Sequence, residues 1–366
     1  MSLLEAAHQV HTVIKRPTTC VVVPAFNEEA GLPDTLEALL KQTEKAERIV
    51  VVDDCSTDRT RAVALSYPGV ECITPSQNLG SKAKAQNYAL EFIEEDLVLP
   101  VDADTVLRPT YLSLIKQPFI DDENVVIAAG NVQTKFTKHI TERGRQIEYL
   151  FGFHLYRPIQ NRANSPIVCS GCCSAFRTKD LVEFGGFPER TIVEDFDYTW
   201  SQQIAGRRAI YVGNAEAWAA DPATPKFLNT QMKRWMSGFF QNMRIHFWGA
   251  VRHKPMLALW AGLTMIEVIT MPLWWASPII MSWALHMGIW ISLFWWLGLD
   301  ALLMIPVLAY ASHRRHVNFI SVMCNIPAMY FNKVFNTYHA LRGMFVELIL
   351  VPMGITKGLA VYEKGR

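Results

Sequence analysis

The stretch Leu97-Val98-Leu99-Pro100-Val101-Asp102-Ala103-Asp104 decides the fold. Its first five residues are apolar and predict a buried strand, and two carboxylates follow where that strand ends. The same arrangement recurs earlier, where a second strand pattern over residues 48–52 ends at Asp53 and Asp54. Because the carboxyl ends of parallel strands share one edge of a sheet, both acidic pairs are expected at the same edge.

Strand and helix patterns alternate on both sides of these two runs. Strands are predicted at residues 18–23, 48–52, 70–74 and 97–101, and helices between them at 28–45, 60–67 and 81–94. This alternation predicts an α/β fold with a mainly parallel sheet. Further strands are predicted at 125–132 and 168–177, and further helices at 139–162, 195–205 and 230–248. No G-x-G-x-x-G pattern follows the first strand, so dinucleotide binding is not supported.

Composition limits the classes of partner. The formal net charge of the 366-residue chain is +1, which gives no electrostatic footprint for nucleic acid. Seven cysteines occur at irregular spacing, with Cys169, Cys172 and Cys173 close together. A zinc site needs four ligands, and no paired Cys/His motif supplies the rest, so reduced thiols are the favoured interpretation.

A long apolar segment follows the acidic clusters. Residues 256–311 contain only Glu267 and Asp300 as charged residues, enough length for two membrane helices of about 20 residues each. We place these helices at about 256–281 and 288–311. Basic residues flank both outer ends, whereas the loop between the helices has none, so both ends are expected in the cytoplasm of a plasma-membrane protein.

Three domains are expected from these patterns. Residues 1–16 could form an amphipathic helix, either on the membrane surface or packed on the catalytic domain. Residues 17–250 would form the α/β catalytic domain, and residues 251–366 the membrane domain. Within the latter, apolar patches over 317–355 are interrupted by polar residues, which fits either a third membrane helix or interfacial helices.

The acidic clusters have both chemical and structural interpretations. Asp102 and Asp104 lie on one side of an extended strand end and suit Mg²⁺ or Mn²⁺, although acidic turns are common. Glu194-Asp195 follows a β-branched run, so a carboxylate there could serve as a general base or simply cap a helix. Asp53-Asp54 could equally begin a capped helix.

The last motif is Gln231-Met232-Lys233-Arg234-Trp235. Gln231, Arg234 and Trp235 would share one helical face. Arginine can donate two parallel hydrogen bonds to a diphosphate, and tryptophan offers a flat face for a sugar ring. A membrane-interface helix would also place Arg and Trp in this way.

These motifs together resemble a known family. The segments 21–29, 51–58, 78–87, 102–104, 191–195 and 231–235 resemble, in order, the motifs of family 2 glycosyltransferases with the GT-A fold. The last motif resembles the branch of cellulose, hyaluronan and poly-N-acetylglucosamine synthases and ceramide glucosyltransferases. The resemblance covers residues 17–245 and implies a GT-A catalytic domain followed by transmembrane and interfacial helices.

The resemblance also implies a donor site and a metal. The nucleotide, expected to be uridine diphosphate, would be contacted by Glu28, Asp53, Asp54 and Lys82. Asp104 would ligate Mn²⁺ or Mg²⁺, with Asp102 near the metal or the ribose.

The remaining motif residues would act on the reacting groups. Asp195, next to Glu194, would be the catalytic base of an inverting transfer, and Gln231 and Arg234 would hold the donor diphosphate. Trp235 would form the floor of the acceptor site. The acceptor terminus would be lined by Ser170, Gly171 and Cys172.

Three functions remain open at this point. The first is extension of a polysaccharide from a nucleotide sugar at the membrane. The second is single transfer to a membrane lipid, which the short membrane part favours, since a channel would need several helices or a homo-oligomer. The third is a non-catalytic scaffold or a transporter, which the intact carboxylates and the small number of intramembrane ionisable residues disfavour.

Overall fold

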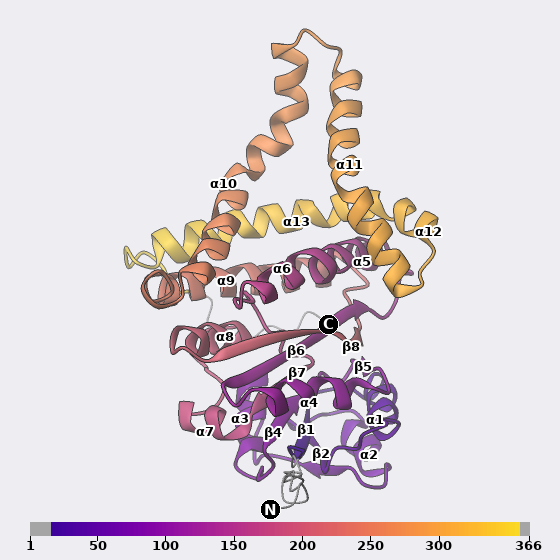
Figure 1. The fold of residues 1–366 in the computed structure, drawn as a ribbon, viewed down its shortest axis with the longest axis vertical. Helices are drawn as coiled ribbons and strands as arrows, with labels where there is room; N and C mark the ends of the chain where they lie inside the picture. The colour runs from indigo at the N-terminus through magenta and orange to yellow at the C-terminus, as the bar shows by residue number, and fades with distance from the viewer. Residues whose placement is uncertain (1–15, 359–366) are drawn as a thin grey trace, which may run out of the picture.

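The computed structural model describes residues 16–358, and the expected helix at residues 1–16 lies almost entirely outside them. An eight-stranded sheet forms the centre of the α/β domain (Figure 1). Its strands are β1 (Thr19–Ala25), β2 (Arg48–Asp53), β3 (Glu71–Ile73), β4 (Leu97–Pro100), β5 (Val106–Leu107), β6 (Val125–Thr134), β7 (Ser174–Arg177) and β8 (Arg208–Ala219).

The helices of the α/β domain connect and cover these strands. They are α1 (Leu32–Leu40), α2 (Thr60–Leu65), α3 (Lys82–Leu90), α4 (Tyr111–Asp121), α5 (Ile140–Phe151), the π-helical turn η1 (Gly152–Tyr156), α6 (Arg157–Arg162), α7 (Thr178–Phe184), α8 (Glu194–Ile204) and α9 (Pro225–His253). The C-terminal part contains α10 (Pro255–Ala284), α11 (Ile289–Arg315), α12 (Phe319–Cys324), α13 (Ile326–Phe345) and the π-helical turn η2 (Val346–Leu350).

The first half of the sheet is parallel, as the alternating pattern predicts. Strand order is β3-β2-β1-β4-β7-β6-β8-β5, and β1 lies parallel to both β2 and β4. Val22 is aligned with Val50 on one side and with Pro100 on the other. The valines of β1 are buried, as expected for a strand covered on both faces. This register places the ends of β1, β2 and β4 next to one another.

The second half of the sheet is mixed. The short strand β7 pairs antiparallel with β4 and β6, whereas β6 and β8 are parallel with irregular register. A strand was expected over 168–177, but it begins only at Ser174. The backbone N–H and C=O of Gly171 are bonded to side chains, so they are not available for strand pairing. Strand β8 was not predicted, because Gly213 and Asn214 interrupt its apolar alternation.

Helices α10 and α11 extend away from the α/β domain as a hairpin (Figure 1). Both are long and apolar enough to cross a membrane, with mean hydropathies of 1.7 and 1.9 over an apolar 18-residue stretch of each. Only 22% and 17% of the residues in these stretches are buried, so these helices are less buried than the core helices of a soluble protein. Trp283 and Trp290, at the end where the two helices meet, are each 80% exposed.

Helix α13 runs across the base of this hairpin, over α5 and α9 (Figure 1). Its Asn332 side chain donates to the Thr141 carbonyl (2.8 Å), and Asn336 donates to Glu148 (2.8 Å). A Cβ added at Gly144 would lie 2.4 Å from the Ala328 carbonyl oxygen, so only glycine permits this approach of α5 to α13. The segment predicted as interfacial or membrane-spanning therefore packs on the α/β domain.

Candidate active site

A cavity of about 790 Å³ lies beyond the carboxyl ends of β1, β2 and β4. Helix α9 lines its opposite side through Gln231, Arg234 and Trp235, and the cavity extends to Thr264 and Val268 of α10. Most residues predicted for the site line it: Glu28, Asp54, Lys82, Asp102, Asp104, Ser170, Cys172, Glu194, Asp195, Gln231, Arg234 and Trp235. The acidic pairs thus meet at one sheet edge, as parallel pairing of their strands requires.

Asp53 and Asp54 have different positions although they are adjacent. Asp54 lines the cavity, and its carboxylate accepts a hydrogen bond from the Leu79 N–H (2.7 Å). Asp53 is buried and is not among the lining residues; its carboxylate accepts from the Ser56 N–H (3.1 Å). The geometry therefore gives Asp53 a turn-forming contact and leaves Asp54 facing the cavity.

Lys82 connects the strand-end carboxylates to the segment around Gly171. Its ammonium forms an ion pair with Asp102 and donates to the Gly171 carbonyl (3.0 Å). Burial alone would lower the pKa of Lys82, but the carboxylates of Asp102 and Glu194 outweigh burial and raise the pKa above its usual range. Lys82 is therefore a fixed positive charge on the wall of the cavity.

Asp195 stands at the N-terminus of α8 with its carboxylate held on both oxygens. The Gly171 N–H donates to Oδ2 (2.8 Å), and the Phe196 N–H donates to Oδ1 (2.9 Å). A Cβ added at Gly171 would lie 3.2 Å from Asp195 Cβ and 3.4 Å from Glu194 Oε1. Gly171 does not line the cavity itself, but its lack of a side chain lets the two carboxylates approach its backbone.

Glu194 is buried beside Asp195. Burial raises the pKa of Glu194, and the neighbouring Asp195 carboxylate acts in the same direction, while the charge of Lys82 opposes both. A carboxyl group with a raised pKa holds its proton to higher pH than an ordinary glutamate does.

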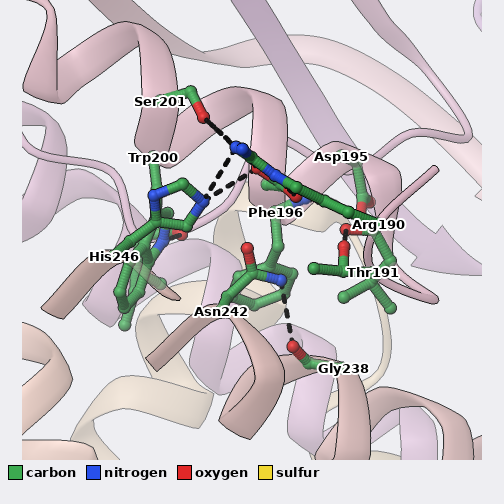
Figure 2. Close-up of polar contacts among 12 residues, drawn as sticks. Arg190, Thr191, Asp195, Phe196, Trp200, Ser201, Gly238, Asn242 and His246 are labelled. Carbon is green, nitrogen blue, oxygen red and sulfur yellow. Dashed lines mark hydrogen bonds and ion pairs between the residues drawn. The ribbon is translucent and has the colours of Figure 1, made fainter. Parts of the chain in front are cut away.

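The start of α8 is tied to α9 by charged hydrogen bonds (Figure 2). Arg190 donates to both oxygens of Asp197, at 2.8 and 2.7 Å, and His246 Nε2 lies 2.8 Å from Asp197 Oδ1. Burial would raise the pKa of Asp197, but the bonds from Arg190 and His246 outweigh it, and the pKa is lowered. Through these bonds to Arg190 and to His246 of α9, the Asp197 carboxylate fixes the segment that carries Asp195.

Arg145 of α5 is a site residue that sequence reasoning missed. Its guanidinium donates to Gln231 Oε1 (2.9 Å), lies 4.9 Å from the centre of the Trp235 ring and pairs with Glu148 (2.6 Å). These contacts set the orientation of Gln231 and Trp235, which both line the cavity. Arg145 was hard to recognise in the sequence, because it lies within an ordinary helical pattern, 86 residues before Gln231.

Asp221 is a second missed residue, positioned just after β8. It lines the cavity, accepts a hydrogen bond from the Tyr149 hydroxyl (3.1 Å) and lies 3.5 Å from Arg145 Nε. Burial raises the pKa of Asp221 to about 7, against the lowering effect of Arg145. This part of the cavity therefore combines carboxyl, phenol and indole groups, a composition suited to sugar hydroxyls and ring faces.

The cysteines and the strand-end carboxylates bear on metal binding. All seven cysteines are free thiols, and Cys172 lines the cavity. Within residues 16–358, no group of three or more His, Cys, Asp or Glu side chains is arranged to hold a metal ion. Any metal at Asp102 and Asp104 would need ligands from a bound molecule.

Comparison with known proteins identifies the family. Residues 20–185 match the family model described as Glycosyl transferase family 2, and this part of the chain is a domain of that family. The chain is 30% identical over 269 residues to a hyaluronan synthase of Streptococcus pyogenes, covering 68% of this chain and 62% of that protein. It is 25% identical over 260 residues to the poly-beta-1,6-N-acetyl-D-glucosamine synthase of Staphylococcus aureus (strain COL), covering 69% and 61%.

The fold is that of a solved glycosyltransferase. The mannosyltransferase PcManGT of Pyrobaculum calidifontis, solved with GDP-Man and Mn²⁺, aligns over 85% of this chain and 87% of its own, with a TM-score of 0.60 and 22% identity. The catalytic domain thus has the GT-A fold expected from the motifs. The chain spans about three-fifths of the length of the two synthases it matches.

Proposed function

We propose that this chain is an inverting, metal-dependent glycosyltransferase that transfers a sugar from a UDP-sugar to a growing polysaccharide at a membrane. One observation carries the proposal: the fixed carboxylate of Asp195 shares a single cavity with Asp104, Lys82, Arg234 and Trp235. Such a cavity can hold a charged donor at one side and an acceptor at the other. The similarity to two polysaccharide synthases supports the choice of a polymeric acceptor.

Asp195 would act as the base. Its carboxylate would take the proton of the acceptor hydroxyl while that oxygen forms a bond to the anomeric carbon. The bond from that carbon to the diphosphate oxygen breaks on the opposite face, which inverts the configuration, and the electron pair leaves with UDP. The two N–H groups that bind Asp195 hold its carboxylate in place for the proton transfer.

The charge of the leaving diphosphate would be balanced at the donor side. Asp102 and Asp104 fit a divalent ion whose other ligands come from the donor phosphates, as is usual for Mg²⁺. Both carboxylates line the cavity, and we assign Asp104 as the metal ligand, with Asp102 near the metal or the ribose. A bound metal would act as a Lewis acid on the diphosphate, and Gln231 and Arg234 would bind the same group.

The membrane context rests on the helical hairpin. Exposed apolar side chains along α10 and α11 would face lipid, and α13 would lie at the interface on top of the catalytic domain. Arg314 and Arg315, at the end of α11, would then be cytoplasmic together with the catalytic domain.

Single transfer to a membrane lipid is the second candidate, and one observation favours it. The cavity reaches Thr264 and Val268 on α10, a candidate membrane-spanning helix. A lipid with a reactive hydroxyl could approach from that side, although a polysaccharide could also leave there.

The test is UDP release by the purified protein in detergent with Mn²⁺, across a panel of UDP-sugars, with products resolved by chain length. A ladder of products from one donor supports the polysaccharide synthase, and one small lipid-linked product supports the alternative. Asp195→Asn should abolish transfer while leaving UDP binding intact, because it removes the base and not the diphosphate ligands. Normal transfer by this variant would rule out Asp195 as the base.

A further inference from the structure

Helix α9 has a second set of residues, which contact the segment 190–197 that carries Asp195. Gln231, Arg234 and Trp235 line the cavity. Further along the helix, Gly238, Gln241 and His246 contact Val193, Ile192 and Asp197 of the segment 190–197. A Cβ added at Gly238 would lie 2.3 Å from Val193 Cγ2, so helix and segment are in direct contact. One helix therefore touches both the cavity and the backbone leading to Asp195.

Gln241 makes the polar contact in this second set. Its Oε1 accepts a hydrogen bond from the Ile192 N–H (3.1 Å), and its Nε2 donates to Glu347 Oε1 (3.1 Å). Both side chains are buried, with 4% of Gln241 and 1% of Glu347 exposed. Since the two ends of a glutamine amide have nearly the same shape, hydrogen-bond partners decide which end faces which neighbour.

Glu347 is suited to make that decision. A carboxylate only accepts hydrogen bonds, so it binds the NH₂ end of Gln241 and leaves the oxygen end for Ile192. Arg244 Nη2 lies 3.4 Å from Glu347 Oε2 and provides a counter-charge. If the amide were reversed, its NH₂ group would face the Ile192 N–H, and two donors would be opposed in a buried space.

We propose that Glu347 is a positioning residue that sets the Gln241 amide, and through the Ile192 N–H the backbone that carries Asp195. This inference rests on the proposed role of Asp195 as the base. Glu347 belongs to η2, which follows the α10–α11 hairpin and α13 in the chain. The C-terminal segment beyond the membrane hairpin would thus control the geometry of the catalytic carboxylate.

The test exchanges the amide and the carboxylate between positions 241 and 347. Gln241→Glu opposes two carboxylates, so we expect kcat for UDP release to fall about tenfold at unchanged UDP affinity, as the base segment shifts by a fraction of an ångström. In the double variant Gln241→Glu/Glu347→Gln, residue 347 becomes the donor and residue 241 still accepts from Ile192. We expect kcat to recover to within about threefold of wild type.

A surface pair provides the matched control. Gln117 donates to Asp121 (2.6 Å) on the exposed face of α4, so Gln117→Glu also opposes two carboxylates, but on a helix that does not line the cavity. We expect no change in kcat for this variant, because exposed charges interact weakly. Wild-type kcat in Gln241→Glu, or a double variant as slow as the single one, would overturn the proposal.

Hydrogen exchange gives a readout that does not depend on activity. In Gln241→Glu, the amides of the 190–196 peptide should exchange at least about tenfold faster than in wild type, and the double variant should restore protection. If no donor is turned over by the wild-type protein, the proposed function fails while this exchange pattern still tests the hydrogen-bond relay. Unchanged exchange in Gln241→Glu would refute the relay itself.

Discussion

Gly171→Ala tests the placement of Asp195 with one methyl group. The Gly171 backbone has no positive φ, so alanine can adopt its conformation without strain. The new Cβ would lie 3.2 Å from Asp195 Cβ, 3.3 Å from its Oδ2 and 3.4 Å from Glu194 Oε1. Contacts this tight require the neighbour to move by a few tenths of an ångström. The moved group would be the proposed base, and its 2.8 Å bond from the Gly171 N–H would lengthen.

The expected size of the effect follows from that displacement. Misplacing a catalytic group by about 1 Å can cost about 100-fold in rate, so a few tenths should cost roughly fivefold. That loss corresponds to about 1 kcal/mol in the activation free energy. We expect the loss in kcat, measured as UDP release at saturating donor, with the dissociation constant of UDP unchanged.

A glycine in open space serves as the control for this substitution. A Cβ added at Gly298 in α11 meets no atom within 4 Å, so Gly298→Ala should leave kcat unchanged. An unchanged kcat in Gly171→Ala would refute the argument that this backbone positions the base. An equal loss of UDP affinity would instead assign Gly171 to the donor site.

Three further predictions concern the surroundings of the site. Gly238→Ala should destabilise the protein by about 1–3 kcal/mol, because the new Cβ would overlap Val193. The melting temperature of this variant should fall well below that of Gly249→Ala, whose new Cβ has ordinary 3.5 Å contacts. Equal melting temperatures would contradict the close contact between Gly238 and Val193. Burial raises the pKa of Asp221 in the folded protein to about 7, above its ordinary value. Between about pH 4 and pH 7 the folded protein therefore keeps a proton that the unfolded chain has lost, so the free energy of unfolding should fall as the pH rises through this range. Asp221→Asn should remove this part of the pH dependence of the melting temperature, and an identical slope in the variant would refute the shift. Trp235→Ala should raise the KM for the acceptor more than it weakens UDP binding, and equal loss of both would count against a stacking role.

Much of the fold could be predicted from local pattern. Buried parallel strands are near-continuous apolar runs, so 18–23, 48–52 and 97–101 were recognisable without structural information. The two halves of the sheet differ in this respect. Strand β8 is interrupted by Gly213 and Asn214. Within the expected strand at 168–177, the backbone N–H and C=O of Gly171 bond to side chains instead of to a neighbouring strand.

The sequence predicted which residues form the site, but only some of the contacts between them. The motifs indicated which side chains would meet, and nearly all of them line one cavity; the roles assigned to them stay predictions. Arg145 and Asp221 were missed because neither belongs to a recognisable motif. Both act through neighbours that are distant in the chain, since Arg145 contacts Gln231 and Trp235 across two helices.

By itself, the sequence determined the α/β class, the strand ends that carry the acidic pairs and the two apolar helices, because periodicity and run length are local properties of the chain. Only the tertiary structure decided what surrounds Asp195. The contacts of its segment come from Gly171, Gln241 and, through Gln241, Glu347. Such contacts depend on the direction and distance of side chains up to 106 positions apart, which no local pattern encodes.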